Sequence, residues 1–335
     1  MTLLRDSIPA LERGDTLSTT QMEQMVLEVM DGGVPTDTLA QWLRAMAQRV
    51  PTADELVGGA RAFMSRAVRV RCRTAADRIV DTCGTGGAPK VFNVSTLAAL
   101  LVAASGAPVA KHGNRSRTGF GSAETLEALG MRLDATPQAL ADALDSCGFC
   151  FCMAPRHHPG AAHAAAARRM VTGPTVFNAL GPLCNPAGAG RQLLGVWSAE
   201  MLRPMSEALA RLGCTHALVV HAMDGLDEIS VCAPTMFVRV LHGAVVEQGT
   251  LTPESFGMHS HQVPAPASHS LPEAVTMARD LLQGTCSTTH SDMLVLNAAA
   301  ALVVSGKADR WADSAVMARG MLEQGRGMAL LQTLI

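Results

Sequence analysis

The sequence predicts an α/β fold in which a large domain with a mostly parallel sheet flanked by helices follows a small all-helical domain. With 335 residues, the chain exceeds one average domain of roughly 150 residues. Up to about residue 66 the apolar residues keep helical spacing, whereas from about residue 78 short β-rich runs alternate with Gly-rich turns and Ala-rich helices. Strands that alternate with helices are typical of parallel sheets.

Residues 1–68 are expected to form the helical domain, as three or four short helices. Ser18 with Gln21 and Thr52 with Glu55 have the spacing of capping boxes, which begin helices. Residues 161–170 are expected to form an Ala-rich helix, and helices from about 157–182 are expected to join this domain. Residues 69–335 would then be the α/β domain.

Six short runs are the expected strands of that domain. They read RIVDTC, APVAK, TVFN, LLGVW, HALVVHA and FVRVLHGAVV. Residues 94–110 are the most apolar segment, but they contain Ser, Thr, Gly and Pro and fall short of a membrane span, so we expect a buried helix. Residues 263–272 read as an exposed loop.

Composition excludes several classes of protein. The formal net charge is −2 and aromatic residues make up 3%, without tyrosine, which argues against a nucleic-acid or lipid surface. The N-terminus lacks a signal-peptide core, so a cytoplasmic protein with reduced cysteines is expected. Cys147, Cys150 and Cys152, followed by His157 and His158, superficially resemble a metal cluster, but the alternation FCFCM favours a buried strand.

Two Gly-rich segments favour phosphate. In DTCGTGGAPKVFNVST a strand runs into Gly84-Thr85-Gly86-Gly87, and Asn93-Val94-Ser95-Thr96 opens a helix, which places backbone N–H donors together. This is neither a P-loop nor a dinucleotide fingerprint; a structural turn without ligand is the alternative. In VAKHGNRSRTGFGSAE the side chains of Lys111, His112, Asn114 and Arg115 precede a second Gly/Ser turn at Ser122. That set suits a polyphosphate, with a solvated loop as the alternative.

Two further segments carry charged side chains. The run HALVVHA ends in Asp224-Gly225 and the adjacent carboxylates Asp227-Glu228, which are Mg²⁺ candidates unless they form only a surface acidic turn. In RHHPGAAHAAAARRM, His158 precedes a helix that ends near Arg168 and Arg169, either of which could bind a carboxylate. The histidine spacings of five and six residues do not suit a zinc site.

Taken together, these segments resemble the anthranilate phosphoribosyltransferase family. The matching pieces are GTGG, FNVSTLAALLVAASGAPVAKHGNRS, GSAETLEALG, the HHP to RR segment, TVFNALGPLCNPAGAGRQLLGVW and VVHAMDGLDEIS. The resemblance implies transfer of phosphoribose from 5-phosphoribosyl pyrophosphate to the amine of anthranilate, with release of pyrophosphate, in tryptophan biosynthesis. It also implies Mg²⁺ as cofactor and a homodimer formed through the helical domain.

The resemblance also implies the roles of individual residues. The phosphoribosyl donor would bind Gly84, Thr85, Gly86, Gly87, Asn93, Ser95, Thr96, Lys111 and Ser122. Anthranilate would contact Gly84, His112, Asn114, His158, Arg168 and Pro182, and Mg²⁺ would be held by Ser95, Asp227 and Glu228. No catalytic base is assigned, because metal and dipoles aimed at pyrophosphate, together with orientation of a neutral amine, supply the chemistry.

The chain departs from the family pattern at two donor loops. Ala88-Pro89-Lys90 follows GTGG where the family has Asp and further Gly, and Arg117-Thr118-Gly119-Phe120 forms a shortened second loop. We hypothesise that Lys90 contacts pyrophosphate, the alternative being a solvated lysine. Two other functions stay open: transfer to another aromatic or nucleobase acceptor, and nucleic-acid binding without transferase activity. The net charge of −2 favours the enzyme over the latter.

Overall fold

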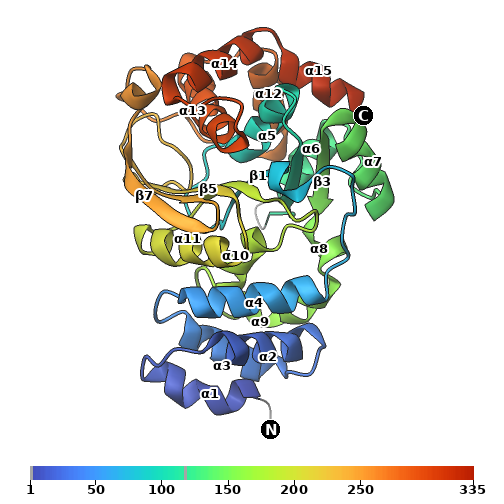
Figure 1. The fold of residues 1–335 in the computed structure, drawn as a ribbon, viewed down its shortest axis with the longest axis vertical. Helices are drawn as coiled ribbons and strands as arrows, with labels where there is room; N and C mark the ends of the chain where they lie inside the picture. The colour runs from blue at the N-terminus through green and yellow to red at the C-terminus, as the bar shows by residue number, and fades with distance from the viewer. Residues whose placement is uncertain (1–2, 117–118) are drawn as a thin grey trace.

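The computed structural model describes residues 3–116 and 119–335 and has a helical part below a larger α/β part (Figure 1). The first four helices are α1 (Leu3–Glu12), α2 (Thr19–Met30), α3 (Thr36–Met46) and α4 (Ala53–Ser65). Both predicted capping boxes are present, at the starts of α2 and α4. The apolar faces of these helices enclose Trp42, which is fully buried. The four short helices therefore form as predicted.

One seven-stranded sheet forms the centre of the α/β part, in the order β3-β2-β1-β4-β5-β6-β7. The strands are β1 (Val80–Gly84), β2 (Val109–Gly113), β3 (Phe149–Met153), β4 (Arg191–Gly195), β5 (His216–Ala222), β6 (Thr235–Leu241) and β7 (Ala244–Leu251). Strands β1 to β5 are parallel, whereas β6 and β7 run antiparallel to their neighbours. The mostly parallel sheet is confirmed, and FCFCM forms the buried strand β3.

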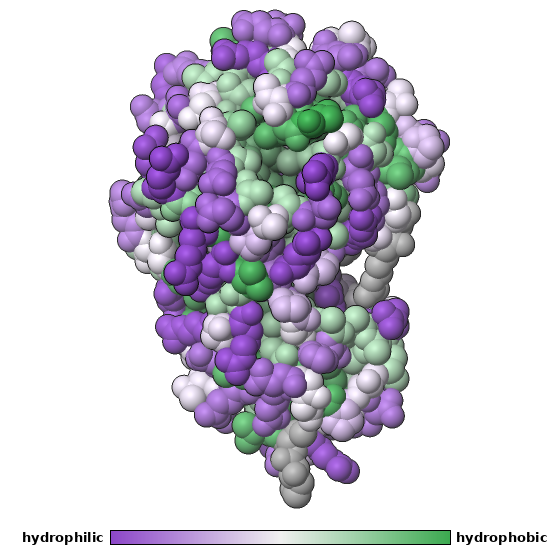
Figure 2. Space-filling view, turned by 90° about the vertical axis from the view of Figure 1, so that its right-hand side faces the viewer, coloured by the Kyte–Doolittle hydropathy of each residue, from purple (hydrophilic) through white to green (hydrophobic). Residues whose placement is uncertain are grey.

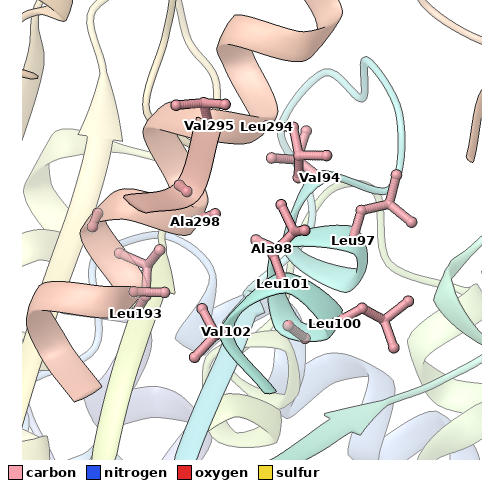
Figure 3. Close-up of a cluster of buried hydrophobic side chains, with 14 of the residues drawn as sticks. Val94, Leu97, Ala98, Leu100, Leu101, Val102, Leu193, Leu294, Val295 and Ala298 are labelled. Atoms are coloured by element: carbon pink, nitrogen blue, oxygen red, sulfur yellow. The ribbon is translucent and has the colours of Figure 1, made fainter. Parts of the chain in front are cut away.

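Helices α5 (Val94–Ala104) and α13 (Thr288–Ser305) pack together over one face of the sheet. Figure 3 shows Ala98, Leu101 and Val102 of α5 facing Leu294, Val295 and Ala298 of α13, with Leu193 of β4 beneath. All of these side chains are buried. Residues 94–110 thus contain a buried helix, as predicted, followed by the start of β2. This packing fixes where α5 begins, which positions the site described below.

The remaining helices complete the two parts. They are α6 (Ser122–Ala128), α7 (Pro137–Cys147), α8 (Ala154–His157), α9 (Ala165–Arg169), α10 (Val176–Leu180), α11 (Leu202–Arg211), α12 (Leu271–Leu282), α14 (Trp311–Glu323) and α15 (Arg326–Thr333). Short 3₁₀ turns are η1 (Ala76–Arg78), η2 (Pro159–Ala164), η3 (Gly181–Leu183), η4 (Ala199–Met201) and η5 (Pro253–Phe256). No described helix is long and apolar enough to cross a bilayer. Hydrophilic side chains cover much of the face in Figure 2.

Four predicted elements differ in detail. The run FVRVLHGAVV is not one strand, because the turn at His242-Gly243 divides it between β6 and β7. TVFN is not a strand: Thr175 caps α10, and the Asn178 side chain accepts a hydrogen bond from the Thr175 N–H at 3.0 Å. The Ala-rich segment 161–170 is only partly α-helical, since the 3₁₀ turn η2 precedes α9; these two elements contact α2 and α3, as expected. Residues 263–270 form a loop in which Val263 is exposed but Ala265 is buried, and α12 begins at Leu271.

Candidate active site

The predicted binding residues gather at the carboxyl edge of the parallel strands. Gly84, at the end of β1, pairs with Gly195 of β4, which in turn pairs with Val220 of β5. The loops that follow β1, β2 and β5 therefore emerge at the same edge. Open α/β sheets bind their ligands at this edge.

The ends of β1 and β4 leave no room for a Cβ atom where they meet Asp227. A Cβ atom on Gly84 would lie 2.6 Å from Oδ2 of Asp227, and one on Gly195 would lie 1.6 Å from the Asp227 backbone oxygen. Gly86 and Gly87 have φ angles of +65° and +94°, which L side chains rarely adopt. Glycine at positions 84 and 195 lets the loop after β5 lie against β1 and β4, and the Gly86 N–H donates to the Asp227 carboxylate.

The first turn of α5 is fixed from two sides. The Thr82 hydroxyl donates to the Ser95 backbone oxygen at 2.7 Å, and the Thr96 hydroxyl donates to Oγ of Ser122 at 2.8 Å. Asn93 precedes the helix, and its side-chain amide donates to Thr125 Oγ1 at 2.6 Å. The predicted donor residues of the two Gly-rich segments are thus joined by direct hydrogen bonds.

Lys111 lies beneath this turn and is 2% exposed. Its ammonium donates to the Thr82 carbonyl oxygen at 2.5 Å and to Ser95 Oγ at 3.3 Å. Burial lowers the pKa of Lys111, and the carboxylate of Asp81 opposes that change. The structure therefore places a buried cation against the hydroxyl that was predicted to bind metal and donor.

Asp227 and Glu228 lie side by side on the loop after β5. Burial, reinforced by the Asp227 carboxylate, raises the pKa of Glu228 to about 8. Burial also raises the pKa of Asp227, although the backbone N–H of Gly86 donates to its carboxylate. The Glu228 carboxylate accepts from the backbone N–H of Ser95. Two partly buried carboxylates beside a serine hydroxyl form a set of oxygen donors that suits a divalent cation.

Lys90 joins the two donor loops. Its ammonium donates to the Phe120 carbonyl oxygen at 2.6 Å and lies 5.0 Å from the centre of the Phe120 ring. Partial burial lowers the pKa of Lys90 to about 8, although the carboxylates of Glu124 and Glu228 oppose this. The shortened second loop includes Arg117 and Thr118, which lie outside the described residues. The Lys90 side chain is exposed, and its ammonium links the two loops.

His112 and His158 form a buried pair, with ring centres 5.2 Å apart. The Gly181 carbonyl oxygen accepts from Nδ1 of His112 at 3.1 Å, and the Cys184 carbonyl oxygen accepts from Nε2 of His158 at 2.8 Å. The other ring nitrogens, Nε2 of His112 and Nδ1 of His158, are buried and have no hydrogen-bond partner in the described chain. Burial lowers the pKa of His112 to about 3 and that of His158 to about 4. Both rings are therefore neutral at pH 7, and each keeps one buried lone pair without a partner in the described chain.

Arg168 lies at the end of α9. Its guanidinium donates to Asn178 Oδ1 at 3.2 Å and lies 5.9 Å from the Phe177 ring centre. The side-chain amide of Asn178 donates to the Thr85 carbonyl oxygen at 3.4 Å. Pro182 is buried in the segment that follows α10. Asn114 is exposed after β2 and accepts from the Arg115 N–H at 2.7 Å, a local contact that does not join it to the histidines.

Three polar residues near His112 and Arg168 were not predicted from the sequence, namely Asp81, Asn178 and Asn185. Asp81 is fully buried in β1, where its carboxylate accepts from Asn185 Nδ2 at 2.8 Å and from the His112 N–H at 3.2 Å. Asn178 connects Arg168 to the turn after β1. Each is a polar residue inside an apolar run, which is the signal that could have identified them.

The cysteines of β3 make local contacts. Sγ of Cys150 and Sγ of Cys152 lie 3.9 Å apart and are buried. The Val68 carbonyl oxygen accepts from His157 Nδ1 at 2.6 Å. In the part of the chain that the structure describes, no group of three His, Cys, Asp or Glu side chains could hold a metal ion.

Comparison with known proteins gives matches over almost the whole chain. The model described as Glycosyl transferase family, helical bundle domain, matches residues 5–67, and the one described as Glycosyl transferase family, a/b domain, matches residues 76–328. A curated anthranilate phosphoribosyltransferase of Rubrobacter xylanophilus is 41% identical over 335 residues, covering 99% of this chain and 97% of the relative. One of Azotobacter vinelandii is 40% identical over 324 residues, covering 95% and 92%.

Solved structures give the same match. Anthranilate phosphoribosyltransferase from Thermus thermophilus is 36% identical, covers 98% of both chains and superposes with a TM-score of 0.89. The protein of the same name from Saccharomyces cerevisiae, solved in complex with PRPP and Mg, is 23% identical with a TM-score of 0.86, covering 99% of this chain and 96% of that one. At that identity the likeness is one of fold.

Proposed function

This chain belongs to the anthranilate phosphoribosyltransferases, and we propose that the residues at the carboxyl edge of its sheet bind the two substrates and the Mg²⁺ of that reaction. The resemblance inferred from the sequence motifs is thereby confirmed. The reaction transfers phosphoribose from 5-phosphoribosyl pyrophosphate to the amine of anthranilate and releases pyrophosphate. The observation that carries the assignment of the site is the convergence of Lys111, Ser95 and Glu228 beside the Gly-rich turn.

The donor binds along the two Gly-rich segments. Its residues are Gly84, Thr85, Gly86, Gly87, Asn93, Ser95, Thr96, Lys111 and Ser122. The Gly-rich turn lets a phosphate group approach the backbone closely, and the buried ammonium of Lys111 supplies positive potential where phosphate oxygens lie. Hydrogen bonds between α5 and α6 hold these groups in place before the donor arrives, which lowers the cost of ordering them on binding.

Ser95, Asp227 and Glu228 hold Mg²⁺. Burial raises the pKa of both carboxyl groups, and the Asp227 carboxylate adds to the rise at Glu228. A divalent cation would favour the charged form of both groups. The Lys111 ammonium, 3.3 Å from Ser95 Oγ, is compatible with a cation there because phosphate oxygens would separate the positive charges. Bound Mg²⁺ supplies electrostatic stabilisation of the departing pyrophosphate.

Anthranilate binds next to the histidine pair. Its residues are Gly84, His112, Asn114, His158, Arg168 and Pro182. The Arg168 guanidinium pairs with the carboxylate of the acceptor. The neutral rings of His112 and His158 offer lone pairs that can accept from an aromatic amine, which is itself neutral at pH 7. The residues thus orient the amine toward the anomeric carbon, and no catalytic base is assigned.

The larger organisation follows the same family pattern. The helical domain comprises residues 1–68 joined by helices from about 157–182, and residues 69–335 form the α/β domain. Contacts of α9 with α3 and of η2 with α2 support this division. Two copies of the helical domain form a homodimer in the cytoplasm, which light scattering of the purified chain would test: a mass near twice that of the 35.0 kDa chain is expected, and a monomer contradicts it.

Isothermal titration tests the assignment of ligands. We expect 5-phosphoribosyl pyrophosphate to bind with Mg²⁺, and Asp227→Asn/Glu228→Gln to bind it far more weakly in the same buffer. Binding of single-stranded DNA without donor binding would instead favour the nucleic-acid alternative. Donor binding without turnover of anthranilate would point to another acceptor.

A further inference from the structure

Asn297 is a buried amide in an otherwise apolar helix segment. It lies in α13 and is 0% exposed. From Met293 to Val304 every other residue is Met, Leu, Val or Ala, and Figure 3 shows its neighbours Val295 and Ala298 within the hydrophobic cluster. A buried amide is costly unless its polar atoms are hydrogen-bonded. The contacts of this side chain therefore point to its role.

The amide of Asn297 binds both backbone groups of one residue. Its Oδ1 accepts from the Ile229 N–H at 2.9 Å, and its Nδ2 donates to the Ile229 carbonyl oxygen at 2.9 Å. Nδ2 also donates its second hydrogen to the Met293 carbonyl oxygen at 2.9 Å, within α13 itself. Both donors and the acceptor are thus used, and the side chain can hold Ile229 in only one orientation.

Ile229 directly follows the carboxylates of Asp227 and Glu228. Asp227 lies against β4, because its backbone oxygen occupies the place that a Cβ on Gly195 would take, 1.6 Å away. The Leu226 carbonyl oxygen accepts from the Ala222 N–H at 2.9 Å. The short segment is therefore fixed on its N-terminal side by the sheet and on its C-terminal side by α13.

We propose that Asn297 is a positioning residue that holds the Asp227-Glu228 segment in the conformation that binds the divalent cation. The proposal rests on the metal site proposed above. Without Asn297, the backbone of Ile229 has no partner on α13, and the two carboxylates are free to separate from each other and from Ser95. Asn297 touches neither substrate nor metal, and its effect passes through the backbone.

The test measures metal binding apart from catalysis. Mn²⁺ alone is titrated into the full chain and followed by electron paramagnetic resonance, for wild type and for Asn297→Leu, which keeps the branched shape of the side chain but not the amide. Leu302→Ala is the matched control, because it removes buried methyl groups from the same helix without touching Ile229. Asn297→Ser provides the comparison if the leucine variant does not fold, since its hydroxyl is too short to reach both backbone groups.

We expect the Kd for Mn²⁺ to rise at least tenfold in the Asn297 variant and to stay within twofold of wild type in Leu302→Ala. The KM for the phosphoribosyl donor should rise with it, while the KM for anthranilate stays within twofold. The proposal is overturned if the Kd of the Asn297 variant is less than three times the Kd of Leu302→Ala.

Asp227→Asn/Glu228→Gln separates this failure from that of the metal site. If the double variant loses Mn²⁺ while the Asn297 variant keeps it, the metal site stands and the role of Asn297 falls. If the double variant also keeps Mn²⁺, the metal assignment itself is wrong, and the proposal for Asn297 is wrong with it.

Discussion

The imidazole rings of His112 and His158 lie 5.2 Å apart, and a backbone carbonyl fixes the tautomer of each. His112 thereby keeps Nε2 as an acceptor, and His158 keeps Nδ1. Neither of these two nitrogens has a hydrogen-bond partner in the described chain. The amine of anthranilate could donate a hydrogen bond to them.

The first prediction concerns pH and the stability of the free protein. The folded-state pKa of His158 is lowered to about 4 from its ordinary 6.5. Its contribution to the free energy of unfolding is therefore present above pH 6.5 and is lost as pH falls toward 4. Wild type should lose roughly 1–2 kcal/mol of unfolding free energy from this residue between pH 7 and pH 5. Urea denaturation should show a shallower decline in His158→Gln than in a variant of the exposed His259. Equal slopes would contradict the buried neutral ring.

The second prediction concerns the carboxylate pair. The folded-state pKa of Glu228 is raised from 4.5 to about 8, so its stabilising effect exists below pH 4.5 and is lost as pH rises toward 8. Asp227→Asn/Glu228→Gln should therefore unfold no more easily than wild type at pH 7.5. Its turnover should fall at least ~100-fold, a barrier increase of about 2.7 kcal/mol. Reduced stability with near-normal turnover would show a structural role instead. Asp309→Asn, at an exposed carboxylate, is the control.

Arg168 should govern acceptor affinity. Arg168→Lys keeps a positive charge but loses the planar fork, so the KM for anthranilate should rise about tenfold or more, with the donor KM changed by less than twofold. Arg169→Lys, at the exposed neighbouring position, should change neither. Parallel increases in both KM values would assign Arg168 to structure rather than recognition.

Lys90 should contribute to donor binding. Lys90→Met deletes the charge and the hydrogen bond to the Phe120 carbonyl oxygen while keeping the stem. If the ammonium also contacts pyrophosphate, the loss is roughly 1.5–3 kcal/mol, which is about tenfold to hundredfold in donor KM at low salt, and less at high salt. An unchanged donor KM at low ionic strength would limit Lys90 to joining the two loops.

Gly195 should tolerate no side chain. In Gly195→Ala the new Cβ would lie 1.6 Å from the Asp227 backbone oxygen, so β4 or the loop after β5 must move. We expect the free energy of unfolding to fall by more than ~2 kcal/mol. Turnover should also respond less to added Mg²⁺ than it does in wild type. Gly320→Ala in α14, where the nearest atom is a flexible side chain at 3.9 Å, should instead stabilise by about 0.5–1 kcal/mol. Equal stability of the two variants would contradict the packing described here.

Local signals predicted much of the fold and the site. The capping boxes at Ser18 and Thr52, and the Gly-rich turn before Asn93, are complete within a few residues, so the sequence reveals them directly. TVFN was misread because Val and Phe favour strands, whereas the Thr175–Asn178 cap made it a helix. The β6–β7 hairpin was missed because its turn is His242-Gly243, with φ angles of +49° and +74°, rather than Asn-Gly.

Contacts between distant segments could not be predicted from the sequence. Asn297 binds the backbone of Ile229, 68 residues away in the chain, and Asn185 donates to Asp81, 104 residues away. Nothing near these residues in the chain indicates which backbone or carboxylate they bind. Only the packing of α13 and of the segment after α10 on the sheet brings the partners together.

The loss of anthranilate fluorescence tests the central claim most directly. Purified chain is mixed with anthranilate, 5-phosphoribosyl pyrophosphate and Mg²⁺, and the fluorescence is followed beside mixtures that lack the donor or contain a chelator. The fluorescence should fall only in the complete mixture, in step with release of pyrophosphate. Steady anthranilate fluorescence in the complete mixture, with a folded chain that binds the donor, would contradict the assignment.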